Sequence, residues 1–280
     1  MTGEWGSECF TPVSTPFSNY HIHLHGGAVL ADGITSANTV GYTSKDVAAG
    51  TFYLIGTQFD KAGTATAGSV DMNDLIKLSA TLAPGLYDDD FVTAPQIQVQ
   101  KPAGGYDKYY YISDGTDADD NELGYAAWCD VDGYELTDAA KLQLGKGFWF
   151  YSPVAGGTIT TAGQVYDSVS KTLSFAAGQF TILCNPYPAA VTLQSLTTSA
   201  TAGLYDDDFA TAPQIQVQKP AGGYDKYYYI SDGTDADDNE LGYNTWCDVD
   251  GYELDGAQIA PGAAFWIYAP ATGGTLTFTL

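Results

Sequence analysis

Arginine is absent from the 280 residues of this chain, so lysine supplies all ten of its basic side chains. Aspartate and glutamate together number 34, which gives a formal net charge of −24 at pH 7. Arginine is the residue that binds phosphate with two hydrogen bonds, and a strongly acidic surface repels a polyanion. The sequence therefore argues against nucleic acids and anionic membrane surfaces as partners.

Long apolar runs are missing as well. No stretch approaches the roughly 20 apolar residues of a membrane-spanning helix, so we expect no membrane insertion. Residues 1–9 lack the basic start and apolar stretch of a signal peptide, as a mature chain without its leader would. Charged residues make up only 16% of the chain and hydrophobic ones 45%, a composition that supports packed cores rather than disorder.

An internal repeat is the main positive feature of the sequence. Residues 85–136 and 203–254 are identical at 49 of 52 positions. The differing pairs are Val92 and Ala210, Ala126 and Asn244, and Ala127 and Thr245. A catalytic site rarely needs a near-copy in the same chain, whereas binding surfaces and building blocks gain from repetition. The repeat therefore favours a binding or structural role.

Short alternating segments predict strands throughout the repeat. Residues 96–100 read Q-I-Q-V-Q, and after a Pro-Ala-Gly-Gly turn the Tyr-rich residues 106–112 return as the partner strand. The same hairpin is expected at residues 214–230. Residues 148–151 and 265–268 read F-W-F-Y and F-W-I-Y, which predicts buried strands with Phe148 and Phe265 in the core.

The repeat extends beyond these cassettes and defines the domain organisation. Residues 48–56 match 176–184, and short helix-like stretches are expected at 70–78 and 191–196. These matches predict an N-terminal arm at 1–34, β-module 1 at 35–162 and β-module 2 at 163–280. The predicted fold class is all-β, with two tandem β-sandwich-like or partly closed barrel modules and an extended N-terminal arm.

The order of these motifs resembles that of uncharacterised β-rich repeat domains in secreted bacterial surface proteins. The residues that carry the resemblance are 180–188 with N-P-Y-P, 191–196, 214–230 and 262–267. Module 1 departs from the pattern, because it has Thr57-Gln58-Phe59-Asp60 where module 2 has Asn185-Pro186-Tyr187-Pro188. The resemblance implies secretion and a cell-surface context, and it implies no catalytic residues.

An acidic loop recurs in both cassettes and predicts a calcium site. Its Asp-x-Asp-x-Asn spacing directs hard oxygen ligands toward one centre, as Ca²⁺ requires. The candidate ligands are Asp114, Asp117, Asp119, Asn121, Asp232, Asp235, Asp237 and Asn239. The central glycine and distal glutamate of an EF-type loop are missing, so a solvated acidic turn is the alternative.

The arm contains one clear alternating strand and all three histidines of the chain. Alternation places the imidazoles on one face and the two aliphatic side chains on the other. The strand residues are Tyr20, His21, Ile22, His23, Leu24 and His25. An H-x-H pair is a common Zn²⁺ or Cu²⁺ ligand set, but no nearby cysteine or carboxylate completes it. The pattern favours a strand docked on a core.

The four cysteines predict two disulfides. Cys129 and Cys247 are equivalent, and Cys184 aligns with Gly56, so module 2 has a second cysteine that module 1 lacks. The economical pairing is Cys184 with Cys247, which leaves Cys129 to Cys9 of the arm. The alternative is buried thiols, which an extracellular location disfavours.

Catalytic residues are not apparent in the repeated cassette. It contains no histidine, no arginine and no G-x-S-x-G motif, so a nucleophile with its base is lacking there. An acid–base glycosidase needs two carboxylates, which the chain has in plenty, but carboxylates this numerous are typical of surface charge. The sequence favours a protein that is not an enzyme.

Two functions agree with these features. The first is an extracellular structural subunit that assembles head-to-tail into a filament, sheath or surface layer, with the arm adding a strand to a neighbouring subunit. Alone, the arm has too little apolar surface to offset an ordering cost of about 1–2 kcal/mol per residue. The alternative is a secreted carbohydrate-binding adhesin, in which Tyr106, Tyr109 and Tyr111 stack on sugar rings in each module.

Overall fold

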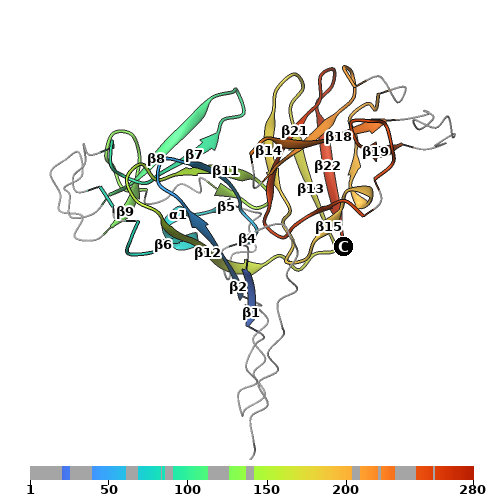
Figure 1. The fold of residues 1–280 in the computed structure, drawn as a ribbon. Coiled ribbons are helices and arrows are strands. Elements are labelled where there is room, and N and C mark those ends of the chain that lie inside the picture. The colour runs from blue at the N-terminus through green and yellow to red at the C-terminus, as the bar shows by residue number, and fades with distance from the viewer. Residues whose placement is uncertain are drawn as a thin grey trace, which may run out of the picture.

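The computed structural model describes most of both modules and one strand of the arm. The described residues are 21–25, 40–60, 69–82, 84–85, 91–112, 126–136, 142–203, 209–219, 222–230, 244–254 and 256–280. Figure 1 shows two β-rich bodies side by side, with β11 and β14 where they meet and the ribbon of β1 and β2 projecting away from both. The all-β prediction is confirmed.

Module 1 is a sandwich of two main sheets. The first has the order β3 (Phe52–Gly56), β11 (Gly147–Tyr151), β7 (Gln96–Gln100), β8 (Tyr106–Ile112) and β9 (Ala127–Cys129). The second joins β1 (His21–His25), β2 (Val40–Val47) and β12 (Gly157–Val165), with β4 (Phe59–Asp60) and β6 (Ile76–Leu78) both paired to β12. A small ladder pairs β5 (Ser69–Val70) with β10 (Leu142–Gln143).

Module 2 repeats this topology strand for strand, except that it has no counterpart of β1 or β4 among the described residues. Its first sheet runs β14 (Thr181–Cys184), β21 (Ala264–Tyr268), β17 (Gln214–Gln218), β18 (Tyr224–Ile230) and β19 (Thr245–Cys247). Its second is β13 (Ser170–Phe175), β22 (Gly274–Thr279) and β16 (Thr197–Thr198), and β15 (Val191–Thr192) pairs with β20 (Gln258–Ile259). No sheet built from the described strands closes on itself, so the modules are sandwiches rather than barrels.

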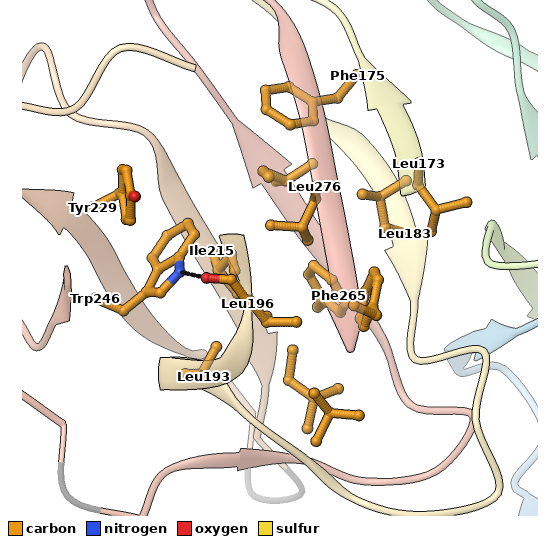
Figure 2. Close-up of a cluster of buried hydrophobic side chains, with 14 of the residues drawn as sticks. Leu173, Phe175, Leu183, Leu193, Leu196, Ile215, Tyr229, Trp246, Phe265 and Leu276 are labelled. Carbon is orange, nitrogen blue, oxygen red and sulfur yellow. Dashed lines mark hydrogen bonds between the residues drawn. The ribbon is translucent and has the colours of Figure 1, made fainter. Parts of the chain in front are cut away.

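The F-W strands form the centre of each core, as predicted. Along β11, alternation buries Phe148 and Phe150 completely and leaves Trp149 half-buried on the opposite face. Phe265 of β21 is likewise 0% exposed, and Figure 2 shows it with Leu276 in the buried cluster of module 2. The prediction that Phe148 and Phe265 lie in the core is confirmed.

The helix-like stretches are shorter than expected. α1 (Met72–Leu75) has four residues and is capped by Asp71, whose carboxylate accepts a hydrogen bond from the Asn73 amide at 2.8 Å. The 3-10 helix η1 (Leu193–Ser195) has three residues. The rest of the predicted stretch 70–78 is mostly strand, because β6 pairs with β12 in the second sheet. Pairing with a neighbouring strand overrides the local helical pattern.

The module boundary predicted from the sequence falls inside an observed strand. β12 runs through Val165, past the expected boundary at 162, and its end pairs with Phe59 of β4. The buried side chains nevertheless form one large cluster for each module. Each module therefore has its own core.

One difference between the two cassettes has a packing partner. Thr245 replaces Ala127, and its hydroxyl donates to the side-chain oxygen of Gln194 at 2.9 Å. In module 1 the position of Gln194 holds Asn73, whose shorter side chain accepts from the backbone amide of Trp128 at 2.9 Å. The longer amide of module 2 thus reaches a hydroxyl that module 1 does not carry.

Replacing Thr245 by alanine is expected to lower the free energy of unfolding by about 1 kcal/mol, since a mostly buried hydrogen bond is lost. The matched variant is Ala127→Thr in module 1, where Asn73 already bonds the backbone, and it should bring no comparable gain. Chemical denaturation of both variants measures the two changes. Equal effects in the two modules would contradict the pairing with Gln194.

Candidate functional site at the arm strand and the module junction

The arm strand is an added strand on the edge of module 1. β1 pairs antiparallel with β2, in a register that runs from His21 opposite Ser44 to His25 opposite Val40. The predicted strand is therefore present over residues 21–25, while Tyr20 lies outside the described residues. The pairing is made within one chain. The side chains of β1, and with them the suggested H-x-H metal ligands, lie outside what the structure describes.

The predicted calcium ligands lie outside the described residues. These are Asp114, Asp117, Asp119, Asn121, Asp232, Asp235, Asp237 and Asn239. In the part of the chain that is described, no group of three or more histidine, cysteine, aspartate or glutamate side chains is placed to hold a metal ion. The calcium hypothesis therefore stays a prediction.

The predicted disulfide between Cys184 and Cys247 is wrong. Cys129, Cys184 and Cys247 are all fully buried thiols. Cys247 packs with Ala212 and Ile230 inside module 2, whereas Cys184 belongs to a different cluster at the module junction. The proposed partner of Cys129 was Cys9, which lies outside the described residues.

Cys184 has the surroundings of an inert thiol. Its Sγ donates to the backbone oxygen of Thr57 in module 1 at 3.4 Å. Burial raises the pKa of the thiol to about 12, and this outweighs the opposing effects of two backbone hydrogen bonds and the Lys146 ammonium. A thiol that does not ionise is a poor nucleophile. Cys184 therefore packs the junction rather than serving chemistry.

Counting reactive thiols tests whether Cys129, Cys184 and Cys247 are free of disulfides. In a Cys9→Ser variant, the native protein should not react with a thiol reagent at pH 8, because the three remaining thiols are fully buried. After denaturation without reductant, all three should react. If only one thiol reacted after denaturation, a disulfide would exist between two of them.

The tyrosines suggested for sugar stacking divide between two faces of β8. Tyr109 is 6% exposed and belongs to the core of module 1. Tyr111 is half-buried and lies 5.2 Å from the Trp128 ring, centroid to centroid, on the same inner face. Only Tyr106 stands on the outer face, opposite Gln100. A three-tyrosine stacking platform is therefore not formed.

The two modules meet through equivalent surfaces of their first sheets. The rings of Trp149 and Trp266, which occupy the same position in the repeat, lie 6.0 Å apart. Gly56 faces its own counterpart Cys184, and a Cβ on Gly56 would lie 2.5 Å from the Cys184 Cβ. A Cβ on Gly147 would likewise lie 2.8 Å from that of Ala264. The junction thus has an approximate two-fold relation, with glycines in module 1 that admit larger side chains of module 2.

Hydrogen bonds across the junction cover the open edge of β14. The Gln100 side chain donates to the Phe180 carbonyl and accepts from the Ile182 amide at 2.9 Å, as a peptide group of a neighbouring strand would. The Cys184 amide donates to the Gly145 carbonyl at 2.8 Å. Such coverage protects a strand edge from pairing with other chains.

Module 1 carries unsatisfied polar groups where module 2 has a complete network. In module 2, the Asn185 amide donates to the carbonyls of Ala189 and Ile259 at 2.8 and 3.1 Å. Thr57 takes the place of Asn185 in module 1, and its buried hydroxyl has no hydrogen-bond partner among the described residues. The side-chain nitrogen and oxygen of the adjacent Gln58 are also buried without a hydrogen-bond partner among the described residues. The departure from N-P-Y-P is visible in the sequence, but the loss of hydrogen-bond partners is visible only in the structure.

A cavity of about 600 Å³ opens beside these residues, between the two modules. Its polar side chains come from module 1 and from the β13–β14 region of module 2. They include Thr57, Gln100, Lys101, Asp107, Gln143, Lys146, Gln179 and Thr181. Burial lowers the pKa of Lys146, whose ammonium donates to the Ser174 carbonyl at 2.7 Å.

None of the described helices is long and apolar enough to cross a membrane. No known protein family, curated protein or solved structure matches this chain.

Proposed function

We propose that this chain is a structural subunit of an extracellular assembly such as a filament, sheath or surface layer, in which the N-terminal arm links neighbouring subunits head-to-tail. The observation that supports the proposal most is the position of β1. It is the outermost strand of its sheet and is attached through five paired residues to the edge of β2. A strand held in this way can be supplied by another chain in the same register.

The geometry of exchange explains why an assembly would grow. Residues 26–39 separate β1 from β2, and fourteen residues can span at most about 50 Å when extended. Each chain carries one donor strand and one acceptor edge. An exchange between unlike surfaces that does not close on itself propagates as an open chain. The repeated modules then provide regularly spaced building blocks.

The remaining features agree with a structural role. The tight junction holds the two modules in one arrangement, and Cys184, a thiol beside a lysine, is not ionised. The buried thiols remove disulfides as an argument for an oxidising compartment. The extracellular location therefore rests on the resemblance to secreted surface domains and on the acidic, arginine-free composition.

Electron microscopy of the purified protein tests the proposal. The full chain should form filaments or sheets, and deletion of residues 1–25 should leave soluble monomers. A finer pair of variants is His23→Pro, which removes a backbone N–H from β1, and His23→Thr, which keeps it. Assembly should fail in the first and persist in the second. Monomers of the full chain at all concentrations would overturn the proposal.

Acid should promote assembly. The net charge of −24 makes subunits repel one another, and protonating carboxylates weakens this repulsion. Sedimentation at decreasing pH, and at neutral pH with increasing salt, should show a growing assembled fraction in both series, because salt screens the same charges. Sedimentation independent of pH and salt would show that acidic surfaces do not face each other in the assembly.

A further inference from the structure

We propose that the cavity between the two modules is a binding site for a sugar acid, with Lys146 as the partner of its carboxylate. The site is distinct from the arm strand and does not depend on assembly. It also differs from a glycan site on each module, because this cavity is formed once, by both modules together.

Charge at the cavity favours an anionic ligand. Of the described residues, three with charged side chains line it: Lys101, Lys146 and Asp107. Asp107 lies 3.7 Å from Lys101, and both are about half exposed. Among the described residues, no carboxylate lies within ion-pair distance of Lys146, so the described part of the cavity wall has an excess positive charge in a chain of net charge −24.

The position of Lys146 leaves hydrogen-bonding capacity for a ligand. Its ammonium has three donors, and among the described residues one of them is used, toward the Ser174 carbonyl. Half-buried at the cavity wall, it is partly removed from water, and burial lowers its pKa. A carboxylate beside the ammonium would favour its charged form and offset this cost.

The other polar groups suit a ligand rich in hydroxyls. The side-chain amide of Gln143 can both donate and accept hydrogen bonds, as can the hydroxyl of Thr181, while the amides of Gln100 and Gln179 already bond backbone groups across the junction. The Thr57 hydroxyl is buried, lines the cavity and has no partner among the described residues. Buried polar groups normally have a partner, so this hydroxyl points to a missing ligand or ordered water.

Size and backbone geometry separate a sugar from a peptide. A cavity of about 600 Å³ falls within the usual range of small-molecule sites, about 300–1,000 Å³. An extended peptide would bind by pairing with a strand edge, but Gln100 and Gly145 already cover the edge of β14. The observations therefore favour a compact sugar acid over an acidic peptide.

Calorimetric titration of the full chain with D-glucuronate and D-galacturonate, each compared with the neutral sugar glucose or galactose, tests the proposal. One uronate at least should bind, and its neutral counterpart should bind at least about tenfold more weakly, since the charge-assisted hydrogen bond is lost. Amide chemical shifts of Gly145 and Gly147, which flank Lys146, should move with the uronate.

Matched variants locate the site. Lys146→Gln should abolish the preference for the uronate. Lys219→Gln removes a lysine charge outside the cavity and should change affinity by no more than about twofold, because Lys219 does not line the cavity and already pairs with Asp225 at 2.8 Å. Lys146→Arg, which keeps the charge, should retain the preference, and thermal melts check that each variant folds. Equal affinity for charged and neutral sugars, unchanged binding by Lys146→Gln, or no binding of either uronate at concentrations of about 10 mM would overturn the proposal.

Discussion

Phe265→Ala is expected to lower the free energy of unfolding by about 3–5 kcal/mol, and Phe148→Ala to do the same in module 1. Both rings are 0% exposed at equivalent positions of the central F-W strands. Phe265 packs against Phe278 of the opposite sheet, with ring centroids 6.2 Å apart. Truncation therefore leaves a cavity between the two sheets that backbone movement cannot readily fill.

Urea denaturation of each variant, followed by tryptophan fluorescence, measures these losses. Phe52→Ala is the control, because Phe52 is 43% exposed and its ring contacts Tyr151, 4.5 Å away, and the edge of Trp149, 6.2 Å away, outside the core. Its loss should cost about 1 kcal/mol. If the three substitutions had similar effects, the core would lie elsewhere.

Gly147→Ala is expected to lower the free energy of unfolding by about 1–3 kcal/mol, through overpacking of the module junction. The new methyl group would overlap the Cγ2 atom of Ile182 and lie 2.8 Å from the Ala264 Cβ. Both neighbours belong to module 2, so the substitution should also weaken the coupling between modules. The two modules of the variant are expected to unfold in two separate transitions, whereas those of the wild-type chain should unfold at more similar denaturant concentrations.

A double-mutant cycle isolates the contact. Ile182→Ala removes the atom that the new methyl group overlaps, so the double variant should be more stable than the sum of the single changes predicts. Ile182 is 1% exposed, so its own truncation also costs stability and must be measured separately. Additive effects would mean that residues 147 and 182 do not touch.

Local patterns were sufficient to predict the strands but not the way in which the modules meet. The alternation in residues 96–100 and 106–112 predicted β7 and β8 with their bounds. The same alternation places Tyr106 on the opposite face from Tyr109 and Tyr111, so the sequence already contained the signal against a shared stacking surface. Helix length was overestimated because residues 76–78 pair with β12, a contact more than 80 residues away.

The junction required tertiary information. Gly56 aligns with Cys184 in the repeat, and this difference was interpreted as a disulfide of module 2 that module 1 lacks. The structure instead places the two residues against each other. A small residue aligned with a larger one is a signal for contact between copies, but it needs the relative placement of the modules to be interpreted. The roles of Lys146 and Thr57 also could not be predicted from the sequence, because the cavity that they line is formed by both modules.

The most direct test of the proposed assembly is a disulfide cross-link between β1 of one chain and β2 of another. His23 and Tyr42 are directly paired. One chain therefore carries His23→Cys and another Tyr42→Cys, each together with Cys9→Ser, and the two proteins are mixed and oxidised. Exchange of the arm predicts a covalent dimer that neither variant forms alone, and a ladder of multimers when both substitutions are in one chain. No dimer in the mixture, with only an internally cross-linked monomer from the double variant, would show that the arm stays on its own module and would contradict the proposal.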